Sequence, residues 1–265
     1  MLRTILTGLV LLATICAAQN RGPYLGFDKN NYPGDDLLPT LHRTFAYTGF
    51  WLNNPPGMTS NPWASKRAVL QEAGFGFLIL FNGRLDSQLE GRDAIALATA
   101  DAKAAVRAAQ REGFPSHVLI FIDQEEGGRL LPEQAAYLDA RFAGVVRAGL
   151  RAGIYCSGID VADGKSVIST AKDIAARFPE VKQWIFNDQC PPSPGCVAKA
   201  GNPAKGGIEN ALVWQFAHSP RSQFAVSCEV GYAADNNCYA PGLSQSDKTM
   251  LDMNTSNEAD PSAGR

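Results

Sequence analysis

Short apolar runs recur along the chain and alternate with longer stretches whose apolar residues follow a helical period. The runs are rich in β-branched and aromatic residues, and several are apolar on both faces, as is typical of strands buried in a parallel sheet. Helical patterns bounded by Pro, Gly or Ser lie at residues 61–74, 93–113, 132–149 and 166–178. Strands are predicted at residues 24–27, 44–51, 75–81, 118–122, 152–156, 183–186 and 212–216, and a weaker one at 231–234.

This alternation of strands and helices predicts an α/β protein with a mostly parallel sheet. About eight strands in about 250 residues fit a closed (β/α)₈ TIM-like barrel, formed as a single domain, better than an open sheet. A doubly wound sheet is the alternative, although no GxGxxG or GxxxxGK[ST] motif follows a predicted strand. The DGKS sequence at 163–166 lacks the upstream glycine of a phosphate loop, and it predicts a turn in which Ser166 caps a helix.

The two ends of the chain differ in composition from the part between them. Residues 1–18 combine one Arg, a short apolar run and small residues, which predicts a secretory signal peptide cut after Ala18. The bulky Ile15 argues against lipid modification of Cys16. The barrel is expected at 19–243, and the polar segment 244–265, which has no apolar periodicity, is expected to be a disordered tail.

Export also sets the expected location and the cysteine chemistry. The protein is expected to be secreted, periplasmic or associated with the cell wall, with no integral membrane segment once the signal is removed. Disulfides are then possible. Pairing the cysteines that are nearest in sequence joins Cys190 to Cys196 and Cys228 to Cys238, each across a short loop. Cys156, which lies in an apolar strand, is left over and is expected to be a buried, inert thiol.

Charge excludes one large class of partner. The formal net charge is −2, the sequence pI is near 5.9, and no cluster of Lys and Arg is interleaved with aromatic residues. A protein that follows a phosphate backbone needs such a basic surface, so nucleic acid is not an expected partner. We expect a monomer.

Candidate chemistry is concentrated in the sequence HVLIFIDQEEGG at 117–128. The predicted strand ends in Asp123 and Glu125, which are two residues apart and would share a face. Two carboxylates held together raise each other's proton affinity, which is a frequent feature of functional sites. Asp28, Asp188 and Asp235 also follow predicted strands, and in a barrel all such ends converge on one mouth. Turn or capping roles are the alternative for these three.

Aromatic and amide side chains are predicted at the same rim and suit the stacking and hydrogen bonding of sugar rings, although a Trp in a strand can equally belong to the core. No pair of histidines has metal-binding spacing, and no metal or cofactor is expected. A Mg²⁺ or Ca²⁺ site made by carboxylates, with phosphodiester chemistry, is the minor alternative and would use Asp28, Asp123, Glu125 and Asp188. The expected sugar-binding residues at the rim are Trp51, Asn82, Tyr155, Trp214 and Gln215.

The ordered motifs GFD, IDQE, GIYCSG, WIFND, VWQFA and ADNN resemble those of the family 25 glycoside hydrolases, the lysozyme-type muramidases. The stretches GFDKNNYPG, FGFLILFNG and DQEEGG are similar to those of exported glycoside-hydrolase-like barrels of unknown function. The resemblance spans residues 26–239. The third strand departs from it, because it ends in LFNG where the muramidases have an aromatic-rich YHF.

The resemblance implies a site for glycoside hydrolysis at the mouth. Glu125 takes the position of the general acid, Asp123 and Asp28 are its partners, and Asp235 is a further carboxylate at the mouth. Asp188, which ends the sixth predicted strand, is also expected to bind substrate. Such hydrolysis needs one protonated and one ionised carboxyl group. The implied partner is a polysaccharide or oligosaccharide of the cell-wall type. A barrel that binds glycan without cleaving it is the second hypothesis.

Overall fold

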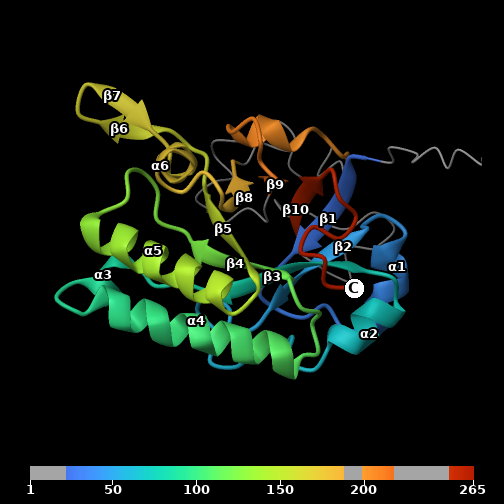
Figure 1. Ribbon diagram of the computed structural model, residues 1–265. Helices are drawn as coiled ribbons and strands as arrows, with labels where there is room; N and C mark the ends of the chain where they lie inside the picture. Colours follow the sequence, from blue (N-terminus) through green and yellow to red (C-terminus); the bar gives the residue numbers. More distant parts are fainter. Residues whose placement is uncertain (1–21, 188–198, 218–250) are drawn as a thin grey trace, which may run out of the picture.

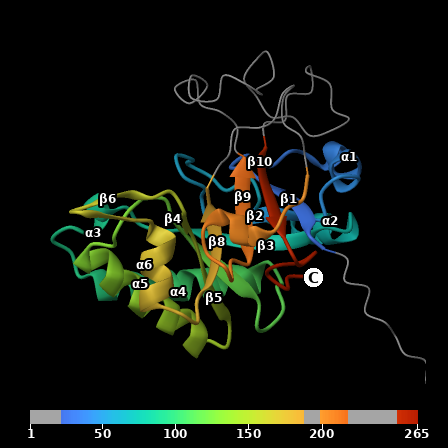
Figure 2. The ribbon, with the colours of Figure 1, turned by 90° about the horizontal axis from the view of Figure 1, so that it is seen from above.

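The computed structural model describes residues 22–187, 199–217 and 251–265. Eight strands close into one barrel in the order β1-β10-β9-β8-β5-β4-β3-β2, which confirms the predicted TIM-like fold (Figures 1 and 2). The barrel strands are β1 (Tyr24–Asp28), β2 (Tyr47–Trp51), β3 (Gly76–Asn82), β4 (Leu119–Gln124), β5 (Arg151–Ser157), β8 (Lys182–Phe186), β9 (Val213–Ala217) and β10 (Asp252–Ser256).

The α-helices cover two sides of this barrel. In Figure 2, α3 to α6 lie on one side and α1 and α2 on the other. The strict alternation of strand and helix is incomplete, because in the described residues only η2 (Pro203–Gly206) lies between β8 and β9. The helices are η1 (Asp35–Leu37), α1 (Leu38–His42), α2 (Arg67–Glu72), α3 (Asp86–Leu89), α4 (Ala94–Arg111), α5 (Pro132–Arg147) and α6 (Thr170–Arg177).

The last barrel strand, β10, corrects the prediction of a disordered tail. It pairs antiparallel with both β1 and β9, whereas the other neighbouring barrel strands are parallel. Its sequence, DMNTS, has no alternation of apolar and polar residues and therefore gave no strand signal. Its polar side chains can be buried because each of the following hydroxyl groups forms a hydrogen bond. The Thr255 hydroxyl donates to the Gly201 carbonyl oxygen over 2.7 Å, and the Ser256 hydroxyl donates to that of Leu212 over 2.9 Å. The weak strand predicted at 231–234 lies outside the described residues.

The C-terminal segment beyond β10 forms hydrogen bonds with the first residues of β3 and β4. The Phe77 N–H donates to Asp260 Oδ1 over 2.8 Å, and the Ile79 N–H donates to the Ser262 hydroxyl over 3.0 Å. The Leu119 N–H donates to the Ser262 carbonyl oxygen over 2.9 Å. The register between β3 and β4 begins at Ile79, so this segment bonds backbone groups at and just before the start of the ladder. Polar residues therefore order the segment from within the fold.

Helices α4 and α5 pack closely because small residues lie at their contact. A Cβ atom added at Gly144 would lie 2.6 Å from the Cβ of Ala102, so only glycine allows this approach. The α4 helix begins where predicted, with the Asp93 carboxylate accepting the Ala96 N–H at 2.9 Å. The α5 helix begins at Pro132, also as predicted.

A two-stranded hairpin, β6 (Val161–Asp163) and β7 (Ser166–Ile168), precedes α6 and projects from the barrel (Figure 1). The DGKS sequence forms the turn of this hairpin, as predicted, but Ser166 belongs to β7 and does not cap the helix. The Ser169 hydroxyl caps α6 instead, accepting the Lys172 N–H. The turn was thus predicted correctly, but the start of the helix was predicted four residues too early. The prediction counts the apolar residues of β7 in the first turn of the helix.

Cys156 is a free thiol buried in β5, as expected. The other cysteines lie outside the described residues, so the two disulfides stay predictions. Among the residues that the structure describes, no helix is both long and apolar enough to cross a membrane.

Candidate active site

Asp28, at the carboxyl end of β1, lies at the centre of a hydrogen-bonded network in the barrel mouth. Its side chain is buried, with 7% of the residue exposed. One carboxylate oxygen, Oδ1, accepts an N–H from Gln215 on β9 over 2.9 Å and another from Asn254 on β10 over 2.6 Å. Three strands thus meet at one carboxyl group.

Two aromatic side chains fix the direction of both amides. The Tyr155 hydroxyl donates to Gln215 Oε1 over 2.7 Å, and the Trp184 indole N–H donates to Asn254 Oδ1 over 2.8 Å. Because each amide oxygen is occupied in this way, each amide N–H₂ group faces Asp28. The network therefore extends through β5, β8, β9 and β10 and holds the Asp28 side chain in one position.

The pKa of Asp28 is raised well above its usual range. Burial is the main cause, because it penalises the charged form, and the negative charge of Asp252 raises the pKa further. The hydrogen bonds from Asn254 and Gln215 act in the opposite direction, because they stabilise the carboxylate. The net effect is a raised proton affinity of this carboxyl group.

Asp123 is the second buried carboxyl group of the mouth, at the end of β4. The residue is 5% exposed, and its Oδ1 atom has no hydrogen-bond partner. Burial raises the pKa of Asp123 well above its usual range, and the charges of Glu125 and then Asp28 raise it further. An unpaired buried oxygen of this kind carries a desolvation penalty that a ligand hydroxyl could relieve.

Glu125 follows β4 and is exposed to solvent. It acts on the Asp123 carboxyl group electrostatically, so the two predicted partners do lie near one another. Glu125 is not buried, because the chain leaves the barrel directly after Gln124. The buried carboxyl groups of the mouth are those of Asp123 and Asp28.

The next residue, Glu126, anchors the loop after β4. Its Oε2 atom accepts the Asp86 N–H over 2.8 Å and the Gln134 side-chain N–H over 2.7 Å. The Thr170 hydroxyl lies 3.2 Å from the Glu126 carbonyl oxygen and 2.9 Å from that of Gly128, and donates toward them. The loop that carries Glu125 is therefore held by α3, α5 and α6.

Sequence reasoning missed Asp252, Asn254 and Lys29 at this mouth. Asp252 opens β10 and pairs with Asp28 in the antiparallel register. The sequence DMN at 252–254 repeats the D-x-N spacing found within the ADNN motif, and this repetition was the signal available. Lys29, directly after Asp28, is half-buried; burial lowers the pKa of its amine, and the charge of Asp252 opposes that shift.

The predicted aromatic platforms are buried in the structure. The Trp51 indole N–H donates to the Lys29 carbonyl oxygen over 3.3 Å, and that of Trp214 donates to the Asn187 carbonyl oxygen over 2.8 Å. Both rings support the mouth from within. Asn82, at the end of β3, donates its side-chain N–H to the Asn54 carbonyl oxygen over 3.2 Å, so it orders the neighbouring loop.

The structure brings Asp28, Asp123, Tyr155 and Gln215 together at the mouth, with Glu125 at its edge. Asp188 and Asp235 lie outside the described residues, and their predicted place at the mouth stays a prediction. Among the described residues, no three His, Cys, Asp or Glu side chains lie close enough to hold a metal ion.

A family model described as the Rv2525c-like, glycoside hydrolase-like domain matches residues 45–191, which is more than half of the chain. The chain belongs to this family. The matched part of the Rv2525c-like domain contains Asp123, Glu125 and Tyr155. Asp28, Gln215 and Asn254 lie outside the match, although the barrel joins them to the same network. No curated protein matches the chain by sequence.

Solved structures share the barrel at low sequence identity. An uncharacterised protein of B. stearothermophilus is 19% identical, with a TM-score of 0.57 over 88% of this chain and 95% of that one. The Tat-secreted protein Rv2525c of Mycobacterium tuberculosis is 13% identical, with a TM-score of 0.50 over 88% of this chain and 94% of that one. The modular autolysin LytC of Streptococcus pneumoniae is 11% identical, with a TM-score of 0.50 over 88% of this chain and 46% of that one. These likenesses show that the fold is shared.

Proposed function

We propose that this Rv2525c-like protein is an exported glycoside hydrolase that acts on a cell-wall-type polysaccharide at the barrel mouth. The observation that carries the proposal is the convergence of Asp28, Asp123 and Glu125, from the ends of two barrel strands, on one face. Glycoside hydrolysis uses two carboxyl groups in different protonation states, and this mouth holds buried and exposed carboxyl groups side by side. The family and the predicted signal peptide support the proposal.

Each carboxyl group has a distinct part in this mechanism. Glu125 faces solvent, where an incoming sugar would shield it, and donates a proton to the leaving oxygen. Asp123, beneath it, supplies negative charge to the cationic transition state once it is ionised, or positions a substrate hydroxyl or N-acetyl group. Asp28, held by the two amides, is the second candidate for either task.

Ionisation of these partners sets the expected pH dependence. Because the pKa values of Asp123 and Asp28 are raised, an ionised partner becomes available only at higher pH than for an ordinary Asp, whose pKa is about 3.9. The acidic limb of the pH–rate profile should therefore lie well above that value. A limb near an ordinary Asp pKa would show that neither buried group is the essential base.

A barrel that binds glycan without cleaving it is the second candidate. The exposure of Glu125 favours it, because a general acid is usually held in a site from which water is excluded. The mouth would then recognise sugar hydroxyls through Asp123 Oδ1, which has no partner, and through the exposed carboxylate of Glu125.

Release of reducing ends from peptidoglycan, chitin and other glycans tests the proposal. The wild type is compared with Glu125→Gln and with Glu133→Gln, a matched change at an exposed residue of α5. We expect turnover by the wild type and the control, and a loss of at least about 100-fold in Glu125→Gln, which is the lower end of what a general acid contributes.

Calorimetry with oligosaccharides, in the presence of a chelator, separates the two candidates. If the protein is a hydrolase, Glu125→Gln should still bind the oligosaccharide. Binding by the wild type and by Glu133→Gln without turnover at any pH, with weaker binding by Glu125→Gln, would favour the non-catalytic barrel. Absence of both binding and turnover across the panel would refute both candidates.

A further inference from the structure

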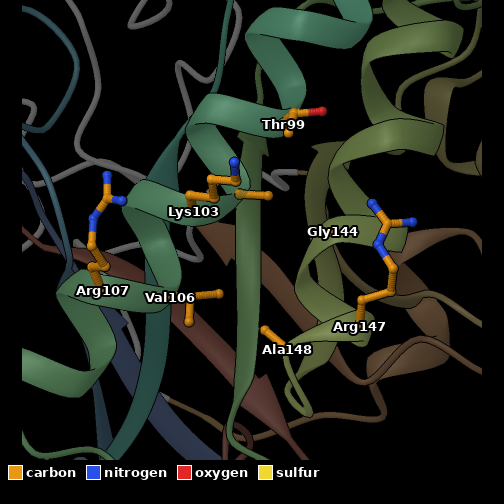
Figure 3. Close-up of a pocket in the computed structure, with 8 residues that line it drawn as sticks. Thr99, Lys103, Val106, Arg107, Gly144, Arg147 and Ala148 are labelled. Carbon is orange, nitrogen blue, oxygen red and sulfur yellow. The ribbon is translucent and has the colours of Figure 1, made fainter.

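A groove of about 240 Å³ lies on the outer surface of the barrel, between α4 and α5 (Figure 3). Its floor is made of small or apolar residues, because the glycine of α5 allows the two helices to approach closely. This volume is below the roughly 300–1,000 Å³ of pockets that enclose a whole small molecule. The groove therefore suits one part of a larger ligand. The floor residues are Ala102, Val106, Gly144 and Ala148.

Cationic side chains border this floor. Figure 3 shows Lys103 on α4 and Arg147 on α5 on opposite sides of the groove, with Arg107 one turn further along α4. Lys103, Arg107 and Arg147 are all exposed. Within the part of the chain that the structure describes, none of the three forms an ion pair, although Lys66, Arg84, Arg129, Lys172 and Arg177 do.

Helix electrostatics explain only part of this cluster. Arg147 lies in the last turn of α5, where a cation interacts favourably with the helix dipole. Lys103 lies about two turns before the end of α4, beyond the reach of that effect. The helix dipole therefore does not account for its position at the groove.

The same helix pair exposes a large apolar side chain on the groove side. Ile95 lies one turn before Thr99, which lines the groove, and is 59% exposed. Exposed apolar side chains beside Lys and Arg characterise surfaces that lie against a bilayer containing anionic lipids. A soluble anion would use the cations alone and would leave the apolar floor without a role.

We propose that this face of the α4–α5 pair docks on an anionic lipid surface. The lipid phosphates lie between Lys103 and Arg147, and the apolar atoms next to them contact the groove floor. Each helix carries the chain back to the start of the next parallel strand, so the C-terminal ends of α4 and α5 lie at the end of the barrel opposite the mouth. Arg147 is therefore at the end away from the mouth, and docking along this side of the barrel leaves the mouth open to a ligand outside the membrane.

Sedimentation with lipid vesicles tests this proposal on the exported protein. Vesicles of phosphatidylglycerol mixed with phosphatidylcholine are compared with vesicles of phosphatidylcholine alone. The test variant is Lys103→Glu with Arg147→Glu. The matched control is Arg43→Glu with Lys165→Glu, which makes the same change in net charge at exposed residues outside the groove.

We expect the wild type and the control to bind the anionic vesicles, and the groove variant to bind at least about tenfold more weakly, given the contribution of each basic residue near a membrane. Thermal melting verifies that each variant is folded. If the double Glu variant is unfolded, Lys103→Gln with Arg147→Gln replaces it. We again expect weaker vesicle binding by this groove variant and not by the control.

Three results would overturn the proposal. One is absence of binding to anionic vesicles by the wild type. Another is an equal loss in the groove variant and the control, which would indicate attraction by net charge alone. The third is stabilisation of the wild type by inorganic phosphate without vesicle binding, which would identify a site for free anions.

Discussion

Burial gives the two aspartates of the mouth an unusual preference for the proton. The folded protein holds the protons of Asp28 and Asp123 to higher pH than the unfolded chain does, because desolvation raises the pKa of both. Each carboxyl group therefore favours folding below the unfolded pKa of about 3.9, and this contribution is lost as pH rises through the folded pKa. Near neutral pH these residues lower the stability of the protein, as is common at functional sites.

Asp123→Asn should for this reason make the protein more stable near neutral pH. The amide cannot ionise, so the variant avoids a penalty of about 1.4 kcal/mol for each unit by which the folded pKa exceeds the unfolded one. Urea unfolding at several pH values measures the difference, which should disappear at about pH 4 and below.

Asp139→Asn, at an exposed residue of α5, is the matched control. Its difference from the wild type should stay small at every pH. If Asp123→Asn and the wild type had parallel stability profiles, the raised pKa of Asp123 could not be a property of the folded protein.

The central carboxyl groups could be predicted from the sequence because each follows an apolar run that is recognisable alone. Asp28 and Asp123 stand directly after such runs, and strand ends meet in a barrel. Asn254 and Asp252 could not be found in this way, because their strand is polar and its hydrogen bonds are made with distant parts of the chain. The direction of each amide likewise depends on Tyr155 and Trp184, which only the fold brings near.

At the scale of elements, the loop between β4 and α5 links the core to the site edge. The carboxylate of Glu126 bonds the first N–H of α3 and a side chain in the first turn of α5. Gln134 in turn accepts the Leu131 N–H through its Oε1 atom at 2.9 Å, which closes the start of α5. The position of Glu125 thus depends on its neighbour in the sequence.

Glu126→Ala should lower the free energy of unfolding by about 1–3 kcal/mol, because the Asp86 N–H and the Gln134 amide lose their acceptor. Glu133→Ala, an exposed change in α5, should stay within about 0.5 kcal/mol of the wild type. Urea unfolding tests both. Equal effects would show that Glu126 does not hold the loop.

Most parallel strands and long helices were predictable because their periodicity is strong within the element itself. The strands β3, β4 and β5 coincide with the apolar runs, α4 is capped by the expected Asp93, and α5 begins at the expected Pro132. The hairpin before α6 was missed, because its strands are only three residues long. Short and polar elements depend on tertiary contacts and leave little local signal.

At the scale of the molecule, closure of the barrel depends on residues that are far apart in the sequence. β10 lies between β1 and β9, and the residues after it reach the start of β3 and β4. These contacts join the end of the chain to its first half. Long-range pairing of this kind couples the stability of the whole barrel to its last residues.

Ser262→Ala is therefore expected to destabilise the whole barrel, although Ser262 lies three residues from the C-terminus. Its hydroxyl is the acceptor for the Ile79 N–H, which is buried at the base of β3 and would be left without a partner. Loss of that acceptor should cost about 1–3 kcal/mol, measured by urea unfolding. Ser60→Ala, at an exposed position, should change the free energy of unfolding by no more than about 0.5 kcal/mol. Because the segment is part of the barrel, fluorescence and circular dichroism should report the same lowered midpoint. An unchanged midpoint would mean that the end of the chain can separate from the barrel without cost, as the polar sequence alone suggested.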